Sequence, residues 1–470
     1  MPKRYHVAVL ASPPRFHAIG KYATIEFKED CAGSCRECVK KKCVYGVFRE
    51  THEHALKMIE PEYLYICQSC FRCVQECTKG IFSRVINPAY RNLGNNYWSR
   101  DILHRLWYQA HFGKIPVSGA GYRGPFTGKG FDSMWTDMSE IVRPTRDGIH
   151  GREYINTSIE LSRRNTFLTF APDGSLDCEP PPILEIPIPV LFQWPENIVK
   201  TRSLILSTAM AAVELGTLLF LDPEDFTEAL LPYAGNMVFR VNGGDLSRFP
   251  PFLQQSRMVE ISDGPKLARL VGDLRELRPG LIVAVGVPLT PEAPSTAVRL
   301  AEADVDSIHF YATESGYEKH TASPRFLKDC IRSVHLELVN HSLRQKVNLL
   351  FSGGIAMAEH MAKAIICGAD GVVADTVLPV ALECRLCSRC REGLSCPVKL
   401  DDIINPQWGK QRIVNLMGAW HSQLLEVMGA MGIREARRIR GEIGRSMHFY
   451  ELEREIFGPI FGERKVPECA

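Results

Sequence analysis

Residues 347–375 read VNLLFSGGIAMAEHMAKAIICGADGVVAD. The apolar runs at its two ends, residues 347–352 and 371–375, are typical of buried strands. Between them, residues 357–367 place apolar side chains at helical spacing. A strand, a helix and a second strand in this order predict one βα unit of a parallel sheet, with Gly353-Gly354 in the turn from strand to helix.

The same alternation begins at residue 181. Six further apolar runs precede the quoted segment and are predicted strands: residues 184–192, 215–221, 237–242, 258–262, 281–287 and 307–312. Segments 265–277, 291–303 and 324–341 have helical spacing, and each begins with a proline in its first turn. With the two strands above, the count closes at eight. This favours an α/β fold with a (β/α)8 TIM barrel over residues 181–380, rather than an open doubly wound sheet.

The loops after the seventh and eighth predicted strands form a candidate anion site. In barrels of this kind a phosphate often lies at those two loops. The seventh strand ends in Ser352, Gly353 and Gly354, and the eighth ends in Asp375 and Thr376. Glycines let the backbone approach a phosphate closely, so that N–H groups point at its oxygens. We therefore predict that these five residues bind a phosphate-bearing cofactor.

The chain holds 16 cysteines, and twelve of them fall in three runs of four. The runs are Cys31-x3-Cys35-x2-Cys38-x4-Cys43, Cys67-x2-Cys70-x2-Cys73-x3-Cys77 and Cys384-x2-Cys387-x2-Cys390-x5-Cys396. The N-terminus lacks the apolar region of a signal peptide. Clustered cysteines in a reducing compartment indicate metal ligands rather than disulfides, so a cytoplasmic metalloprotein is expected.

The second run has the spacing by which bacterial-type ferredoxins hold [4Fe–4S] clusters. In such domains each run gives three ligands to one cluster and its last cysteine to the other. Residues 25–90 are therefore predicted to form a ferredoxin-like domain with two [4Fe–4S] clusters. One would be held by Cys31, Cys35, Cys38 and Cys77, and the other by Cys67, Cys70, Cys73 and Cys43. A pair of zinc sites is the alternative, but zinc favours two separated C-x2-C pairs.

The remaining segments are assigned by composition and position. Residues 1–24 are an N-terminal arm, 91–180 an irregular connector, 381–400 the loop of the third cysteine run, and 401–470 C-terminal helices at 411–431, 433–445 and 447–457. The net charge of +2 argues against a nucleic-acid partner. No apolar stretch is long enough to span a membrane.

The region after the eighth predicted strand resembles the synthase domain of glutamate synthases. The similar residues run from Thr376 to Cys384, with Cys390, Cys396-Pro397, Ser352-Gly353-Gly354, Gly432-Ile433 and Arg440-Gly441. The resemblance covers roughly residues 180–445, and with the N-terminal cysteines the build is similar to the archaeal-type large subunit.

The resemblance implies FMN at the predicted phosphate site and a [3Fe–4S] cluster on Cys384, Cys390 and Cys396. Cys387 is a fourth cysteine within the loop. A fourth thiolate predicts a [4Fe–4S] cluster instead, which gives three [4Fe–4S] clusters and one FMN in all.

The substrate side of the barrel departs from the family. The lysine expected on the fifth strand has no counterpart in residues 283–287, and residues 193–196 replace the flavin-facing loop after the first strand. The glycine-rich loop after the sixth strand is replaced by residues 318–321, which include Lys319 and His320. These two are weak candidates for orienting an acceptor; a solvated loop is the alternative.

Two functions remain open at this point. The first is an iron–sulfur flavoprotein oxidoreductase that passes electrons from an external donor through [4Fe–4S] clusters to FMN, which reduces a small-molecule acceptor. The second is a non-catalytic electron-transfer subunit of a larger redox complex, with the substrate site altered or lost. Both require a donor protein, since the one formal G-x-G-x-x-G, at residues 119–124, is followed by Pro125 and does not open a helix.

Overall fold

The computed structural model describes most of the chain outside the N-terminal cysteine region. The described residues are 5–16, 19, 22–26, 35, 38–39, 41–43, 70–86, 88–115, 130–136, 154–162, 169–177, 181–241, 254–449, 455–456 and 458–462. Cys31 and Cys67, both predicted ligands, lie outside them. Among the described helices, none combines the length and the apolar character that crossing a bilayer requires.

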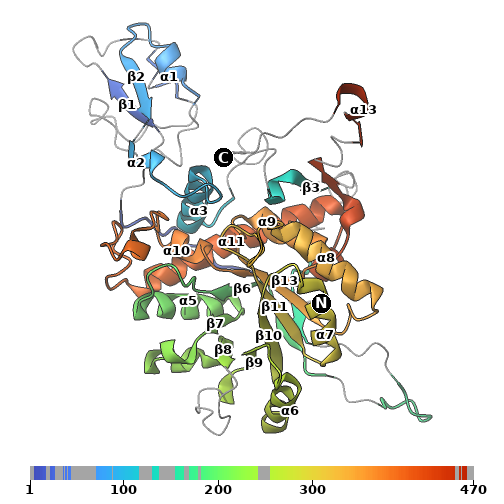
Figure 1. Ribbon diagram of the computed structural model, residues 1–470. Helices are drawn as coiled ribbons and strands as arrows, with labels where there is room; N and C mark the ends of the chain where they lie inside the picture. The colour runs from blue at the N-terminus through green and yellow to red at the C-terminus, as the bar shows by residue number, and fades with distance from the viewer. Residues whose placement is uncertain are drawn as a thin grey trace.

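Eight strands form a closed barrel, in which every neighbouring pair is parallel (Figure 1). They are β6 (Val190–Gln193), β7 (Leu219–Leu221), β8 (Met237–Val241), β9 (Met258–Ser262), β10 (Ile282–Pro288), β11 (Ser307–Tyr311), β12 (Asn348–Ser352) and β13 (Gly371–Ala374). The predicted TIM barrel is confirmed. The first predicted strand, 184–192, divides into β5 (Leu184–Ile186) and β6. Pro187 and Pro189 lie between them, and proline has no N–H to donate to a ladder.

Helices surround the barrel in the predicted order. After β6 comes α5 (Arg202–Leu215), and α6 (Leu267–Leu277), α7 (Ala293–Glu302), α8 (Leu327–Asn340) and α9 (Ala358–Cys367) follow β9 to β12. After β7 the chain forms the 3-10 segments η6 (Pro223–Asp225) and η7 (Glu228–Asn236) instead of an α-helix. Pro232 lies within η7 and disfavours the regular α-helical ladder there.

The long helix α11 (Pro406–Met431) is the helix of the eighth βα unit and closes the ring. It packs against both α5 and α9, the helices of the first and seventh units. Between β13 and α11 the chain forms α10 (Val377–Ala381) and a loop with the 3-10 turn η10 (Arg389–Glu392). The third cysteine run is therefore an insertion within the eighth βα unit, at the end of the barrel where the strands terminate.

A hairpin closes the opposite end of the barrel. β4 (Ile159–Leu161) pairs antiparallel with β5, and its apolar side chains pack into the barrel interior. This interior core comprises Ile159, Leu161, Leu184, Ile186, Leu191, Leu218, Phe220, Val238, Met258, Ile282, Ala284, Leu350 and Val373. The barrel interior is thus filled at the N-terminal ends of the strands, its lower end, and the site loops lie at the opposite, C-terminal end, which we call the mouth.

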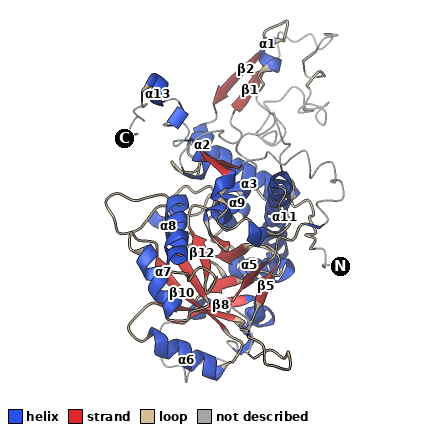
Figure 2. Ribbon diagram, turned by 90° about the vertical axis from the view of Figure 1, so that its right-hand side faces the viewer, coloured by secondary structure: helices blue, strands red, loops and turns tan. Residues whose placement is uncertain are grey.

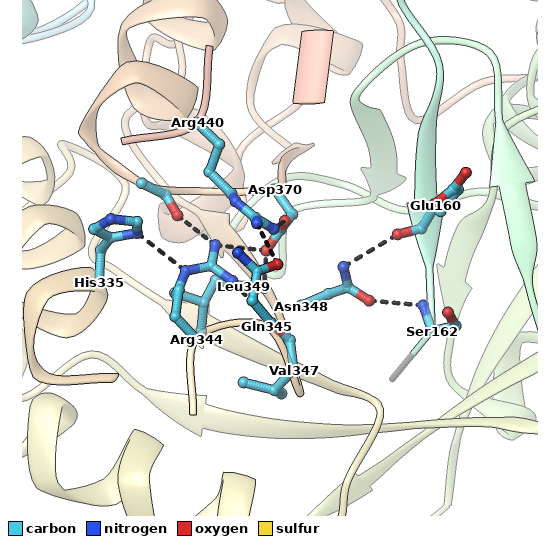
Figure 3. A network of polar contacts seen from close by, with 11 residues as sticks. Glu160, Ser162, His335, Arg344, Gln345, Val347, Asn348, Leu349, Asp370 and Arg440 are labelled. Atoms are coloured by element: carbon cyan, nitrogen blue, oxygen red, sulfur yellow. Dashed lines mark hydrogen bonds and ion pairs between the residues drawn. The ribbon is translucent and has the colours of Figure 1, made fainter. Parts of the chain in front are cut away.

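A buried polar network fastens this lower end (Figure 3). The Arg344 guanidinium donates to Asp370 Oδ2 at 2.7 Å, and Arg440 Nη1 donates to Oδ1 at 2.5 Å. The Asn348 amide bridges the Ser162 N–H and the Glu160 carbonyl, which joins β12 to the β4 hairpin. Burial acts to raise the pKa of Asp370, but the two arginines outweigh it and hold the pKa well below its usual range.

The connector contains a helix that the sequence prediction missed. α3 (Arg100–Phe112) begins at Ser99, whose hydroxyl accepts from the Ile102 N–H, and ends at Gly113 with φ of +64°. It packs on α10 and α11, with its apolar face buried, so residues 91–180 are not irregular throughout. The remaining described pieces are α2 (Pro88–Arg91), η4 (Gly130–Ser133) and β3 (Met134–Thr136).

The N-terminal arm lies against α11. The Asn415 amide donates to the Leu10 carbonyl and accepts from the Leu10 N–H, and the buried Arg412 donates to the Ser12 carbonyl. Farther along, β1 (Tyr22–Glu26) pairs antiparallel with β2 (Phe82–Ile86) beside α1 (Arg72–Gln75). These three elements lie together beyond α2 and α3, away from the barrel strands (Figures 1 and 2).

The C-terminal helices are predicted only in part. α11 confirms the first, but residues 433–445 form two short 3-10 turns, η11 (Ala436–Arg438) and η12 (Ile443–Arg445). Gly441 has φ of +79°, and a Cβ there would lie 2.7 Å from His335 Nε2, so the chain turns where a helix was expected. β14 (Ser446–His448) then pairs with β3, and the last described helix is α13 (Gly458–Phe461).

Candidate functional site

The third cysteine run lines a single pocket at the barrel mouth. Cys384, Cys387, Cys390 and Cys396 all border it. Asn95 from the connector, Ile198 from the loop after β6 and Glu314 from the loop after β11 complete much of its wall. Burial raises the pKa of the Cys384 thiol, and the other three cysteines add to this rise. Four thiols close enough to influence one another form a soft donor set that suits iron–sulfur or zinc chemistry.

The loop that carries these cysteines has an uncommon backbone. Glu383, Leu386, Ser388 and Lys399 adopt left-handed conformations with φ between +49° and +79°. A non-glycine residue in this region costs of order 1 kcal/mol, and such residues concentrate at functional sites. The concentration in one loop indicates that the loop is shaped to direct its cysteines.

Two cysteine pairs from distant parts of the chain share one local structure. Phe71 in Cys70-Phe-Arg-Cys73 has φ 58° and ψ 6°, and Ser388 in Cys387-Ser-Arg-Cys390 has φ 60° and ψ 0°. Each is the residue before a short helical turn that begins with arginine, α1 in one case and η10 in the other. Cys387 therefore occupies the same backbone setting as Cys70, a residue of the ferredoxin-type run.

Three of the described N-terminal cysteines lie at a small core. Val39, Cys73, Ile81 and Phe82 are buried together, and Cys43 and Cys77 pack against them. Cys43 and Cys73 were predicted to hold one cluster and Cys77 the other, so this core does not distinguish the two ligand sets, which stay a prediction. Cys35 and Cys38 are partly exposed and Cys70 is exposed, while Cys31 and Cys67 lie outside the described residues.

The cysteine geometry bears on which metal group fits. Within the described part of the chain, no three His, Cys, Asp or Glu side chains converge as a site for one metal ion. A structural zinc needs four ligand atoms about 2.0–2.3 Å from one point. Four cysteines that border a common pocket are a donor set of the kind that holds an iron–sulfur cluster or a zinc ion.

Three segments hold the third cysteine loop in place. The Arg15 N–H donates to Glu383 Oε1 at 2.7 Å, and Arg15 Nη2 donates to the Val398 carbonyl at 2.8 Å. The Gly94 N–H donates to the Arg385 carbonyl at 3.1 Å. Arg391 pairs with Glu314. The segment that follows the N-terminal cysteine region thus reaches the third cysteine loop directly.

The predicted phosphate turn requires its two glycines, but the close contact that requires them is with another loop of the protein. Gly353 and Gly354 have φ of +88° and +70°. A Cβ on Gly353 would lie 2.4 Å from the Thr313 carbonyl oxygen, and one on Gly354 would lie 2.5 Å from Gly316 Cα. The close approach that requires glycine is therefore to the loop after β11. The Gly354 N–H donates to the Glu314 carbonyl at 3.2 Å.

Asp375 occupies the centre of the predicted phosphate site. Its carboxylate accepts from the Thr376 N–H at 2.5 Å, and the nearby Gly353 N–H acts to lower its pKa. Burial raises the pKa of Asp375 to about 6, and the Glu314 carboxylate adds to the rise. Ser352 is buried beside the turn. The five predicted residues lie together, but the N–H groups of Gly354 and Thr376 already have acceptors and a carboxylate occupies the site, so this arrangement does not fit a flavin phosphate.

Aromatic side chains cover the same turn. The Tyr97 hydroxyl donates to the Gly354 carbonyl, and the Trp98 indole donates to the Glu314 carbonyl at 3.0 Å. The Tyr97 and Phe326 rings lie 6.0 Å apart. Burial raises the pKa of Tyr97 well above its usual range, so the hydroxyl stays protonated. The connector therefore seals this side of the mouth.

A charged network inside the mouth escaped sequence analysis. Glu260 on β9 accepts from Arg240 Nε at 2.9 Å and pairs with His309 Nδ1 at 2.7 Å. The Tyr311 hydroxyl also donates to Glu260. Burial acts to raise the pKa of Glu260, but His309 and Arg240 outweigh it and lower the pKa; burial lowers the pKa of His309. Glu260 is thus held by Arg240 of β8 and by His309 and Tyr311 of β11.

The sequence does carry a sign of this charged network, but it can be recognised only once the strands and their inward faces are known. Val238 of β8 and Met258 of β9 face the barrel interior. His309 of β11 faces it as well, since its ring contacts the interior residue Phe220. Arg240 and Glu260 follow two residues after the first two, on the same face, because strand side chains alternate. Single polar residues in apolar runs were masked by their neighbours in the sequence.

Lys319 and His320 are placed differently. The Lys319 ammonium lies 6.0 Å from the centre of the Tyr311 ring, at the edge of the mouth network. His320 is exposed and has φ of +59°. The structure thus brings Lys319 to the mouth, whereas His320 is part of the solvated loop.

Comparisons with known proteins bear on this arrangement. The family model described as a conserved region in glutamate synthase matches residues 251–434, which contain β9 to β13, the third cysteine loop and α11. The archaeal glutamate synthase (NADPH) of Archaeoglobus fulgidus is 25% identical over 92% of this chain and 96% of its own length. That of Methanocaldococcus jannaschii is 25% identical over 83% of this chain and 95% of its own.

More distant relatives match a shorter part. The ferredoxin-dependent glutamate synthase of Cyanidium caldarium is 30% identical over 28% of this chain and 9% of its own length. The two archaeal relatives are therefore similar to this chain over most of its length, whereas this larger relative is similar over a segment.

Proposed function

This chain is a glutamate synthase-related protein, and we propose that it acts as an iron–sulfur oxidoreductase of glutamate synthase type. When bound, three [4Fe–4S] clusters would supply one-electron transfer from an external donor protein to the barrel. The two N-terminal cysteine runs would hold two of them. Cys384, Cys387, Cys390 and Cys396 would hold the third.

The observation that carries this proposal is the four-cysteine pocket. Its four thiols come from one strained loop, and Cys387 repeats the backbone setting of Cys70. Strain of this kind persists only where the surroundings impose it. A fortuitous group of cysteines would not require it.

The surrounding residues position the loop. Glu383 accepts from Arg15 immediately before Cys384, and the Arg385 carbonyl accepts from the Gly94 N–H immediately after it. Asn95 then borders the pocket. Because Gly94 and Asn95 follow the N-terminal cysteine runs in the chain, this contact supports electron transfer from those runs to the third cysteine loop.

Two endings of the electron path are distinguished by the barrel mouth. In the first, FMN in the mouth accepts the electrons and reduces a small-molecule acceptor, as the family resemblance implies. In the second, the chain is a non-catalytic electron-transfer subunit whose acceptor is a partner protein. The carboxylate of Asp375 in the predicted phosphate site favours the second.

Metal analysis of anaerobically purified protein tests the proposal. About twelve irons and twelve sulfides per chain are expected for three [4Fe–4S] clusters. The reduced protein should transfer electrons to a ferredoxin-type protein or a low-potential dye. Stoichiometric zinc without sulfide, or iron that is not reduced by dithionite, would contradict it.

A further inference from the structure

We propose that Asp375 is a built-in substitute for a phosphate, and that the barrel mouth of this chain is closed to FMN. The inference rests on the proposed function only for the relationship of this barrel to the flavin-binding synthases. It concerns the loops after β12 and β13 and the network beneath them, and is independent of the cluster ligands.

The first argument is an account of the donors. A phosphate at the ends of the seventh and eighth strands would be bound through the N–H groups of Gly353, Gly354 and Thr376. The Thr376 N–H donates to the Asp375 carboxylate, and the Gly354 N–H donates to the Glu314 carbonyl. The Gly353 N–H acts on the Asp375 carboxylate closely enough to lower its pKa. A phosphate would have to displace an internal acceptor from two of the three donors and would meet the Asp375 carboxylate at the third.

The second argument is charge. The charged side chain that acts most strongly on Asp375 is the carboxylate of Glu314. A phosphate dianion placed here would meet two carboxylates rather than a cation. Arg391 pairs with Glu314 rather than with Asp375. Like charges at contact distance oppose binding, and partial burial strengthens the opposition.

The third argument is space. The Gly353-Gly354 turn lies in backbone contact with residues 312–316 and is covered by Tyr97. The Phe326 ring fills the region next to it, since a Cβ on Gly316 or on Gly130 would lie 3.0 Å and 2.6 Å from that ring. The turn is thus packed on the side from which its glycines would be approached.

The fourth argument concerns the fifth strand, where the resemblance predicts a lysine. A Cβ on Gly286 of β10 would lie 1.9 Å from the Tyr311 hydroxyl and 3.0 Å from Glu260 Cδ. Tyr311 and Glu260 therefore occupy the place of any side chain on Gly286. The mouth network with Arg240 and His309 fills this part of the barrel interior in place of a ligand-binding lysine.

These arguments assign the chain a definite place in electron flow. Without FMN the bound groups exchange electrons one at a time, so the acceptor must take single electrons. A redox protein with its own cluster or flavin has that chemistry. The pocket of the third cysteine run, which Asn95 also borders, is the place where we expect electrons to pass to this acceptor.

Flavin binding to the complete, iron-loaded protein tests the inference. FMN would be titrated into wild type and the Asp375→Gly and Asp375→Asn variants, with flavin fluorescence as the readout. Asp273→Asn, on the exposed face of α6, is the matched surface control. Wild type and the control should show no saturable binding. Asp375→Gly, which removes the carboxylate and frees the Thr376 N–H, should bind FMN saturably and at least about 100-fold more tightly than the detection limit set with wild type; Asp375→Asn, which removes only the charge, should gain less.

Three outcomes would overturn the inference. They are stoichiometric FMN in purified wild type, saturable FMN binding by wild type, and failure of both Asp375 variants to gain affinity although iron content and circular dichroism match wild type. Iron and sulfide content is measured on the same samples. Loss of that signal in wild type would overturn the proposed function whatever the flavin result.

Discussion

At the scale of single residues, Cys387 and Asp375 separate this chain from the family that it resembles. Cys387 adds a thiol to a loop in which three would suffice for a [3Fe–4S] cluster. Asp375 adds a carboxylate where a phosphate was predicted. Cys387 lies between Leu386 and Ser388, which both have left-handed backbone, and the Asp375 carboxylate accepts from the Thr376 N–H. Each supports a prediction that depends on one side chain.

Replacement of Cys387 by serine should convert the third cluster from four irons to three. Total iron should fall by about one per chain, and the oxidised protein should show the electron paramagnetic resonance signal of a [3Fe–4S] cluster. Cys330→Ala, at a buried cysteine outside the three runs, is the control and should leave iron content unchanged. Unaltered iron and spectrum in Cys387→Ser would show that Cys387 is not a ligand.

Asp375 should make the fold less stable as pH rises. Its folded-state pKa is raised from 3.8 to about 6, so the folded protein binds the proton more tightly than the unfolded chain. The stabilisation is complete below pH 3.8 and is lost as pH rises to about 6. Asp375→Asn should therefore gain stability relative to wild type between pH 4 and pH 7, by up to about 3 kcal/mol. Denaturant unfolding at several pH values measures this; a constant difference between the two proteins would contradict it.

At the scale of elements, the lower end of the barrel and its mouth show opposite uses of buried charge. Below, Asp370 joins the loop after α8, the start of β13 and the segment after α11 through two arginines. Above, Glu260 joins β8, β9 and β11. The lower network is far from the cysteine loop and serves stability. The mouth network takes the interior space where the family is expected to bind its ligands.

Asp370→Asn should destabilise the barrel by about 3–5 kcal/mol, because it leaves two buried arginines without their carboxylate. The pKa of Asp370 is depressed, so its contribution is present above the unfolded pKa of 3.8 and is lost as pH falls below it. Thermal or urea unfolding at pH 7 gives the size of the loss. Asp304→Asn, at a mostly exposed partner of Arg275, is the control and should change stability by less than about 1 kcal/mol. Equal effects of the two substitutions would contradict the assigned role.

At the scale of the whole molecule, the apolar core around the barrel is far larger than the described core of the N-terminal cysteine region. The barrel core runs through the strands, the surrounding helices and α3. The described core of the N-terminal cysteine region contains only Val39, Cys73, Ile81 and Phe82. A core this small buries little apolar surface, so bound metal should supply much of the stability of that region.

Removal of iron should therefore affect the two parts unequally. After anaerobic chelation, amide hydrogens of β1, β2 and α1 should exchange much faster, whereas those of β9 to β13 should keep their protection. Hydrogen exchange with mass spectrometry resolves both on the same sample. The result would contradict the prediction if barrel protection fell together with that of β1 and β2.

Much of the architecture could be predicted from the chain, because its signals are local. Strand-length apolar runs, prolines in first turns and the Gly353-Gly354 turn predict the eight strands and most of the helices. The helix α3 was missed because its face is shared among α10, α11 and the arm rather than displayed as one apolar stripe. The helix expected over residues 433–445 fails because Gly441 turns against His335, a contact that no local pattern encodes.

In the candidate site too, some features follow from local sequence and others from contacts between distant segments. Cysteine spacing alone predicts the ligand sets, since an iron–sulfur cluster constrains residues that are close in sequence. The barrel mouth depends on side chains that meet across strands, since Arg240, Glu260 and Tyr311 come from three different strands. The role of Asp375 likewise depends on its position beside the Gly353-Gly354 turn and on the N–H group of Thr376. Which donors remain available to a ligand is settled by contacts between distant segments in the folded chain, and composition and spacing do not record them.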